Sequence, residues 1–211
     1  MVASLTVINP LYPSVYYTLG NSLYELGNYK EAIISYKKLI PARRMFKHST
    51  IVTFDDDIIY EPWRLKVLLE CADIYPGCII GFRGKTPTFS LFNEINSYKD
   101  WPYAALTSNQ FLTILTGCGG ILYPPIKDYD QLIQNYQLAV DLGKTCDDVF
   151  FWACALSKSI PRICLGFNKE KEISYTKFNP RLGHINNNPS SCVNDIAISS
   201  FLNHYKIIFR K

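Results

Sequence analysis

The stretch IVTFDDD (residues 51–57) carries the strongest structural and chemical signal in this chain. Its first four residues are apolar or β-branched, a run typical of a short buried strand, and three consecutive carboxylates follow it. Side chains two positions apart on a strand point the same way, so we expect Asp55 and Asp57 on one face and Asp56 elsewhere. In open α/β sheets, ligands bind at the carboxyl ends of the strands. The stretch therefore predicts two neighbouring carboxylates at a sheet edge.

Two carboxylates held close together repel each other unless a cation lies between them. Mg²⁺ and Mn²⁺ are hard ions that take oxygen ligands of this kind and keep positions open for phosphate. We therefore expect a Mn²⁺ or Mg²⁺ site held by Asp55 and Asp57. The alternative interpretation is a solvated acidic turn that caps the following helix.

Segments with strand character alternate with helical segments along the rest of the chain. This alternation predicts an α/β fold, in which a sheet has helices on its faces. Besides the central strand, we expect strands within residues 77–84 and 161–167, and a strand, a glycine turn and a strand within 111–125. We expect helices within residues 61–76, 129–143, 146–159 and 195–209.

The first 40 residues have a different character. Two amphipathic helices, separated at Gly27, are expected between residues 14 and 40, and no strand is expected within residues 1–12. The pair resembles one tetratricopeptide repeat, on the residues Tyr16, Leu19, Gly20, Leu23, Gly27, Tyr29, Ala32 and Tyr36. An ordinary helical hairpin is the alternative. The expected organisation is a hairpin over residues 1–40 and an α/β domain over 41–211, joined by a basic stretch that begins at Pro41.

The α/β part resembles bacterial glycosyltransferases of the A-type (GT-A) fold, the nucleotide-diphospho-sugar transferase class. The segment IVTFDDDIIYEPW resembles their DxD segment, and the similarity continues in order through PGCIIGFRG, TGCGGILYPP, CDDVFFWACAL, LGHIN and NDIAISSFLNHY. It covers roughly residues 37–205. The resemblance implies a partial GT-A-like mixed sheet flanked by helices, following the helical hairpin.

The resemblance also implies roles on the donor side. Asp55 and Asp57 would hold a divalent metal that bridges the diphosphate of a sugar nucleotide, and Asp56 would contact the ribose or order the loop. His184 would be a further metal ligand, with an exposed loop histidine as the alternative. Arg83 would meet phosphate, or else lie in a solvated basic loop.

Two carboxylates later in the chain complete the expected chemistry. Asp148 is the expected general base, which takes a proton from the acceptor hydroxyl as that oxygen attacks the anomeric carbon. Asp147 is expected either to contact the substrate or to cap the helix that follows, where the helix dipole favours a carboxylate.

Five further residues are expected on the substrate side. Gly117, Gly119 and Gly120 would let the backbone approach a sugar closely, with a tight hairpin that binds no ligand as the alternative. Trp101 and Tyr123 would stack on sugar rings, although core packing is an equal alternative for both.

Composition limits the classes of function. A hydrophobic share of 48% and a charged share of 19% predict a folded globular protein. The net charge is only +4 and the basic residues are scattered, which speaks against nucleic-acid binding. Seven cysteines without a CxxC pair predict buried free thiols in a reducing compartment. With no apolar run of spanning length, we expect a cytoplasmic protein, and peripheral contact with a membrane stays compatible with the sequence.

These observations lead to one expected function and two alternatives. The expected function is transfer of a sugar from a nucleotide-sugar donor to a hydroxyl group of a glycan or lipid-linked acceptor, such as a lipopolysaccharide precursor. The first alternative is a non-catalytic interaction protein, in which the hairpin binds a protein partner and the transferase domain is degenerate. The second is another metal-dependent phosphotransfer or hydrolytic enzyme, against which the absence of GxxxxGK[ST] and HExxH motifs weighs.

Overall fold

The computed structural model describes residues 5–7, 38–55, 58–61, 63–142, 146–166, 174–175 and 193–207. Residues 8–37, which contain most of the expected helical hairpin, fall outside these ranges, as do Asp56, Asp57 and His184. The hairpin, the division of the chain at residue 40 and the roles of these three side chains therefore stay predictions.

A mixed β-sheet forms the centre of the fold. Its strand order is β1-β2-β7-β4-β8, with bounds Leu5–Val7 for β1, Thr50–Thr53 for β2, Ile121–Tyr123 for β7, Ile79–Gly81 for β4 and Arg162–Cys164 for β8. β1 is parallel to β2 and β8 is parallel to β4, whereas β7 runs antiparallel to both of its neighbours. The four strands from β2 to β8 confirm the predicted mixed α/β fold.

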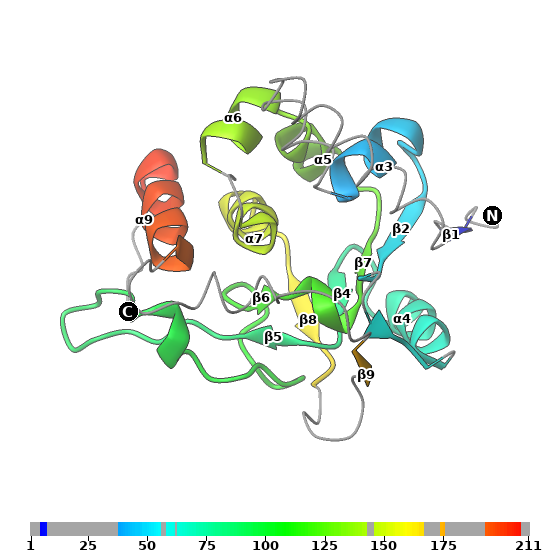
Figure 1. Cartoon of the computed structure of the whole chain (residues 1–211), viewed down its shortest axis with the longest axis horizontal. Coiled ribbons are helices and arrows are strands. Elements are labelled where there is room, and N and C mark those ends of the chain that lie inside the picture. Colours follow the sequence, from blue (N-terminus) through cyan, green and yellow to red (C-terminus); the bar gives the residue numbers. More distant parts are fainter. Residues whose placement is uncertain are drawn as a thin grey trace.

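Helices cover both faces of this sheet (Figure 1). On one side lie α3 (Leu39–Met45), α5 (Lys127–Ile133), α6 (Tyr136–Asp141), α7 (Asp147–Ser157) and α9 (Val193–Tyr205). On the other side lies α4 (Trp63–Ile74). The helices expected within residues 61–76, 146–159 and 195–209 are thus confirmed. No helix in the described part of the chain combines enough length and apolar character to cross a bilayer.

The side chains of the strands pack in two separate cores, because successive side chains on a strand point to opposite faces. Ile51 and Ile121 pack in the larger core beneath α3, α5, α7 and α9. Val52 and Leu122, one position further, pack in the smaller core against α4. All four are at most 3% exposed, and burial of each such side chain contributes about 1.5–3 kcal/mol to folding. The alternation fixes the register of the central strands.

Two short antiparallel ladders lie outside the main sheet. β3 (Ile58–Ile59) pairs with β9 (Ser174–Tyr175), and β5 (Gly84–Lys85) pairs with β6 (Ile114–Leu115). Two 3₁₀ turns, η1 (Tyr98–Asp100) and η2 (Gly117–Gly119), complete the described elements. β6 and β7 flank η2 but pair with different strands. The alternative of a tight hairpin at these glycines is therefore wrong.

The prediction that residues 1–12 hold no strand is also wrong. Leu5–Val7 forms β1, in register with residues 50–52 of β2. The segment is only three residues long, but Thr6 and Val7 are β-branched and suit a strand. Its parallel partner is distant in sequence, and residues 8–49 supply the long connection that parallel pairing requires.

The first part of the basic stretch expected as a junction is helical instead and lies in α3, which ends at Met45. Arg43 within it is fully buried, and its Nε lies 2.9 Å from Asp130 Oδ1 on α5. Its Nη2 donates to the backbone oxygen of Tyr123 at 3.0 Å. Leu39 and Ile40 lie one helical turn before Arg43 and share its buried face. The ion pair and the apolar contacts together dock α3 on the sheet.

The single helix expected over residues 129–143 is two helices, α5 and α6. The side chain of Asn135 accepts a hydrogen bond from the backbone N–H of Leu138 at 3.1 Å and so caps α6. Asparagine is a preferred residue at such a position, because it satisfies a donor that the helix leaves unpaired. The break at Asn135 follows from this cap.

The six described cysteines all carry free thiols, as expected. Cys78, Cys146, Cys154 and Cys164 are buried, whereas Cys71 and Cys118 are half-buried. The expected burial therefore holds for four of the six.

Candidate functional site

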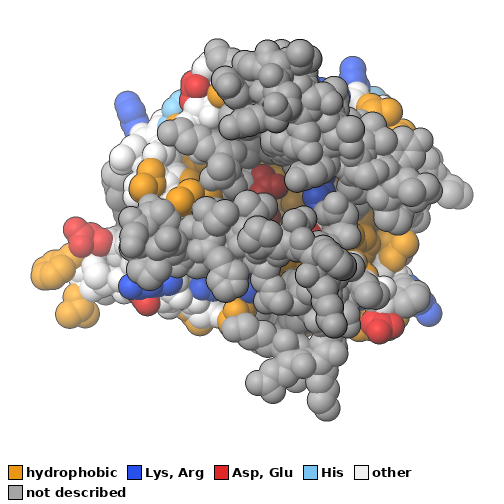
Figure 2. All heavy atoms as spheres, viewed as in Figure 1, with side chains coloured by type: hydrophobic (Ala, Val, Ile, Leu, Met, Phe, Trp, Pro, Cys, Tyr) orange, Lys and Arg blue, Asp and Glu red, His pale blue; other side chains and the backbone are white. Residues whose placement is uncertain are grey.

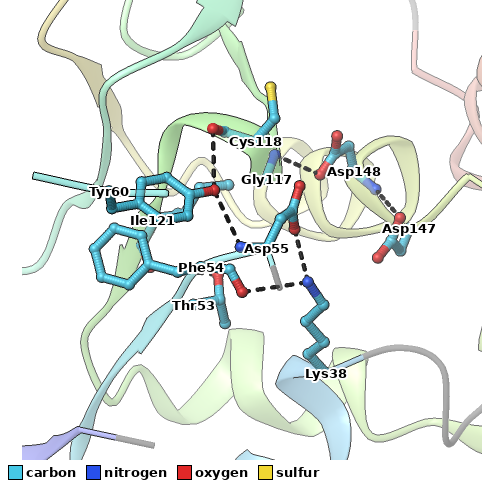
Figure 3. Close-up of polar contacts among 10 residues, drawn as sticks. All are labelled: Lys38, Thr53, Phe54, Asp55, Tyr60, Gly117, Cys118, Ile121, Asp147 and Asp148. Carbon is cyan, nitrogen blue, oxygen red and sulfur yellow. Dashed lines mark hydrogen bonds and ion pairs between the residues drawn. The ribbon is translucent and has the colours of Figure 1, made fainter. Parts of the chain in front are cut away.

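Three segments that are distant in sequence meet at one edge of the sheet. Asp55 follows the end of β2, and Thr53 is in register with Ile121 at the start of the antiparallel strand β7. The turn η2, which leads into β7, therefore lies at the same edge as Asp55. The first turn of α7 lies beside both (Figure 3). We call Lys38, Asp55, Gly117, Asp147 and Asp148 the acidic site.

Tyr60 holds Asp55 next to the glycine turn. The backbone N–H of Asp55 donates to the Tyr60 hydroxyl at 3.1 Å, and that hydroxyl donates to the carbonyl oxygen of Cys118 at 3.1 Å. The Tyr60 ring also packs against Phe54, with 4.5 Å between ring centroids. The Asp55 carboxylate points toward Gly117 (Figure 3). One tyrosine thus ties the end of β2 to η2.

Lys38 pairs with the Asp55 carboxylate. Its Nζ lies 2.7 Å from Asp55 Oδ1 and also donates to the backbone oxygen of Phe54 at 3.2 Å. The two side chains are 30% and 32% exposed, so the pair is reachable from solvent. Figure 2 shows acidic and basic side chains next to each other near the middle of one face of the molecule. Lys38 was not predicted as a site residue, because it falls in the helix expected for the hairpin.

Asp147 and Asp148 open α7 and have different contacts. Asp147 Oδ1 accepts a hydrogen bond from the backbone N–H of Asp148 at 3.2 Å, within its own helix. Asp148 Oδ1 accepts one from the backbone N–H of Gly117 at 3.1 Å, across to η2. Cys146 occupies the N-cap position, and Asp147 is the first residue of the helix, where a carboxylate interacts well with the helix dipole. A contact of Asp147 with substrate stays a prediction. The hydrogen bond from Gly117 directs Asp148 toward the glycine turn.

Gly117 leaves a space between two carboxylates. A Cβ at this position would lie 3.5 Å from Asp55 Oδ1 and 3.5 Å from Asp148 Oδ1. The two oxygens are therefore separated by no more than twice that distance. Both face the same small region (Figure 3). The structure thus brings Asp55, which is expected to bind the donor, near Asp148, which is expected to activate the acceptor.

The electrostatic environment changes the proton affinity of Asp148. Burial raises its pKa well above the ordinary aspartate value, and the negative charges of Asp147 and Asp55 raise it further. The Gly117 N–H and Lys38 act in the opposite direction but do not cancel these effects. A carboxyl group with a raised pKa accepts protons more readily, and such groups are concentrated at functional sites.

The three glycines of the turn have different roles. A Cβ on Gly119 would lie 2.8 Å from the backbone nitrogen and Cβ of Arg83. Gly120 has a φ of +85°, and a Cβ there would lie 2.4 Å from the ring of Phe54. These two positions require glycine for packing and backbone conformation. Of the three, Gly117 is the one that faces the carboxylates.

Arg83 lies beside the turn and contacts it directly. Its Nη1 donates to Cys118 Sγ at 2.6 Å and to Thr116 Oγ1 at 3.4 Å. Its Nη2 donates to the Tyr103 hydroxyl at 3.3 Å. The guanidinium group therefore braces η2 in this structure, and its expected contact with phosphate stays a prediction.

Trp101 and Tyr123 are core residues rather than a surface for sugar stacking. Trp101 is 2% exposed, donates from its Nε1 to the backbone oxygen of Asn96 at 2.8 Å, and packs against Trp152. Tyr123 is 4% exposed and stacks on Tyr129, with 6.4 Å between ring centroids. The expected stacking role is corrected to the packing alternative, because neither ring offers an open face.

The expected site for a divalent cation is described only in part, because Asp57 and His184 lie outside the described ranges. Among the described ranges, no three His, Cys, Asp or Glu side chains gather closely enough to hold a metal ion. Mg²⁺ commonly binds through one or two protein carboxylates, with substrate phosphates and waters as its other ligands. Asp55 supplies one such carboxylate at a solvent-reachable edge.

Comparison with known proteins adds no family assignment. No protein-family model matches this chain, and no curated protein matches it in sequence. The functional interpretation of the acidic site therefore depends on its residues and their geometry.

A separate depression of about 440 Å³ lies elsewhere on the described surface. It is lined by Tyr75, Leu106, Ser108, Asn109, Gln110, Phe111 and Ile163. None of these residues belongs to the acidic site, and none was predicted to be functional. The depression has no titratable carboxylate, histidine or cysteine in its lining, so the acidic site is the better candidate for chemistry.

Proposed function

We propose that this chain is a metal-dependent glycosyltransferase that uses a nucleotide-sugar donor and a hydroxyl group of a glycan or lipid-linked acceptor. The observation that carries the proposal is the closeness of Asp55 and Asp148. The Oδ1 atom of each lies 3.5 Å from the position that a Cβ on residue 117 would occupy. A transferase of this kind needs a carboxylate for the donor's cation and a second carboxylate for the acceptor's proton, close together. This pair meets that requirement.

On the donor side, Asp55 and Asp57 would hold Mg²⁺ or Mn²⁺, which supplies positive charge to the departing diphosphate. Tyr60 orients Asp55 through the hydrogen bond between its hydroxyl and the Asp55 backbone N–H. The parallel strand β1 beside β2 also supports the proposal, because a nucleotide-binding half needs strands that precede the DxD segment.

On the acceptor side, Asp148 is the proposed general base. The acceptor oxygen forms a bond to the anomeric carbon, while the bond from that carbon to the diphosphate oxygen breaks and its electron pair leaves with the nucleoside diphosphate. The proton of the acceptor hydroxyl passes to Asp148. Burial, Asp147 and Asp55 raise the pKa of Asp148, which makes it a better proton acceptor, and the Gly117 N–H holds its Oδ1 in place.

A second candidate is the non-catalytic interaction protein. The observation that favours it is Lys38, whose ammonium already neutralises Asp55 at 2.7 Å. In a degenerate site this ion pair would take the place of a metal ion permanently. The two candidates differ in whether a divalent ion can replace Lys38. For either candidate, a cytoplasmic location remains part of the proposal, and the transferase would meet a membrane surface through a lipid-linked acceptor.

The direct test is turnover of a panel of nucleotide sugars in the presence of Mn²⁺, measured as the nucleoside diphosphate released when the sugar passes to water or to an added glycan. We expect at least one donor to be consumed, and Asp148→Asn to lower kcat by about 100-fold or more. Lys66→Met, on the exposed face of α4, is the matched control and should keep full activity. If the folded protein consumes no donor, or if Asp148→Asn retains the wild-type rate, the proposal is wrong.

A further inference from the structure

A lysine ammonium contacts the carboxylate through which Asp55 would bind a metal ion. Lys38 Nζ lies 2.7 Å from Asp55 Oδ1, and its hydrogen bond to the Phe54 carbonyl at 3.2 Å holds it at the end of β2. Lys38 thus has two contacts with the residues that lead out of the central strand. A cation is therefore already seated in the acidic site.

We infer that Lys38 competes with the divalent cation for Asp55 and thereby sets the metal affinity of the acidic site. The inference rests on the proposed function. Mg²⁺ would bind this carboxylate at about 2.0–2.1 Å, while the Lys38 ammonium lies 2.7 Å from its Oδ1. Two cations on one carboxylate repel each other. Binding of the ion therefore weakens the pair between Lys38 and Asp55, and the pair weakens binding of the ion.

Replacement of the Lys38 ammonium by a divalent ion also affects the charge around Asp148. Burial, Asp147 and Asp55 raise the pKa of Asp148, whereas Lys38 lowers it. Lys38 therefore compensates part of the negative charge around Asp148 while no metal ion is present. A divalent ion on Asp55 would take over that role with twice the charge. The lysine has a flexible four-carbon stem, and the pair is about one-third exposed, so the ammonium can swing into water.

The affinity for Mn²⁺ measures this competition without any requirement for catalysis. We would titrate Mn²⁺ into metal-free protein by calorimetry, and count free Mn²⁺ by electron paramagnetic resonance. Lys38→Met removes the charge and keeps the length of the side chain. Because an exposed ion pair is weak, its loss should tighten Mn²⁺ binding only about three- to fivefold. Lys38→Arg keeps the charge and should stay within about twofold of the wild type.

Lys66→Met is the matched control, since it removes a lysine from another exposed pair, with 3.7 Å between Lys66 Nζ and Glu70 Oε1. Its Mn²⁺ affinity should equal that of the wild type. Lys38→Gln is a second neutral variant that gives the same test if the methionine variant does not fold.

The outcomes separate this inference from the proposed function. Tighter binding in the neutral Lys38 variants, abolished when Asp55→Asn is added, supports both. Equal Mn²⁺ affinity in the wild type and the neutral variants overturns the competition and leaves the metal-dependent function standing. If neither the wild type nor any folded variant binds Mn²⁺, both are overturned.

Discussion

The backbone N–H of Gly117 donates a hydrogen bond to Asp148 Oδ1 at 3.1 Å and thereby joins the glycine turn to the first turn of α7. This contact brings the carboxylate of Asp148 to the end of β2, next to Asp55. The space between the two carboxylates stays open because residue 117 has no side chain. The glycine turn is thus both a structural bridge and the floor of the proposed site.

Substitution of Gly117 tests whether this space is used by a ligand. A methyl group there would make ordinary van der Waals contacts of 3.5 Å with both carboxylates, so Gly117→Ala should fold with a Tm within about 2 °C of the wild type. The same methyl would occupy the region between them. We expect Mn²⁺-dependent nucleotide binding to weaken about tenfold or more, measured by calorimetry. Unchanged binding by a folded variant would show that the space is not part of a ligand site.

Gly120→Ala is the contrasting variant in the same turn. Its φ of +85° strains an alanine, and the added Cβ would lie 2.4 Å from the Phe54 ring. We expect a loss of about 2–3 kcal/mol in the free energy of unfolding, measured by urea denaturation. A loss smaller than that of Gly117→Ala would contradict the division of roles among these glycines.

The raised pKa of Asp148 predicts how stability depends on pH. Because burial and the charges of Asp147 and Asp55 raise this pKa in the folded protein, the folded state favours the protonated carboxyl. The stability that the protonated Asp148 carboxyl contributes is fully present below the unfolded-state pKa of about 4. It is lost as pH rises through the folded-state pKa. Asp148→Asn cannot ionise and avoids this loss. Its Tm should exceed that of the wild type by about 2–4 °C at pH 8.

The difference in Tm should shrink as the pH falls toward 4, because the wild-type carboxyl then becomes protonated as well. Thermal unfolding of both proteins at a series of pH values measures this trend. A Tm difference that is constant with pH, or that is reversed in sign at pH 8, would show that Asp148 has no such environment.

The buried ion pair between Arg43 and Asp130 should be essential for docking α3. Arg43 is fully buried, and its Nε lies 2.9 Å from Asp130 Oδ1. Arg43→Met would leave a buried carboxyl without its partner, at a cost of about 3–5 kcal/mol. The exposed pair that Lys66 forms is the comparison, and Lys66→Met should cost no more than about 0.5 kcal/mol. Urea denaturation measures both, and similar losses in the two variants would refute the importance of burial here.

Local sequence patterns predicted the elements but not all of their partners. The β-branched run of β2 and the apolar face of α7 contain enough information in a few neighbouring residues, and both elements form as expected. Strand pairing depends on residues that are distant in sequence. The strand at Leu5–Val7 and the separation of β6 from β7 were missed for this reason. The burial of Arg43 was missed for the same reason, because its partner Asp130 lies on another helix.

One missed feature did have a local signal. Asn135 precedes a helical segment and caps it through the N–H of Leu138. An asparagine in that position predicts a helix start, so the break between α5 and α6 was readable from the sequence.

The candidate site was predictable only where its chemistry is encoded locally. Asp55 and Asp148 stand out because carboxylates follow a buried strand in one case and open an apolar helix in the other. Lys38 and Tyr60 contact Asp55 through the folded chain, and nothing in their own neighbourhood indicates this. Trp101 and Tyr123 show the opposite error, since aromatic residues suit both sugar stacking and core packing, and here they pack in the core.

The most direct measurement is a calorimetric titration of the wild type and Asp55→Asn with a panel of nucleoside diphosphates, with and without Mn²⁺. We predict that one nucleoside diphosphate binds the wild type only when Mn²⁺ is present, and that Asp55→Asn, with an unchanged melting curve, loses this binding. Binding that is the same in the variant, or that does not depend on Mn²⁺, would contradict a metal-and-nucleotide site at the end of β2.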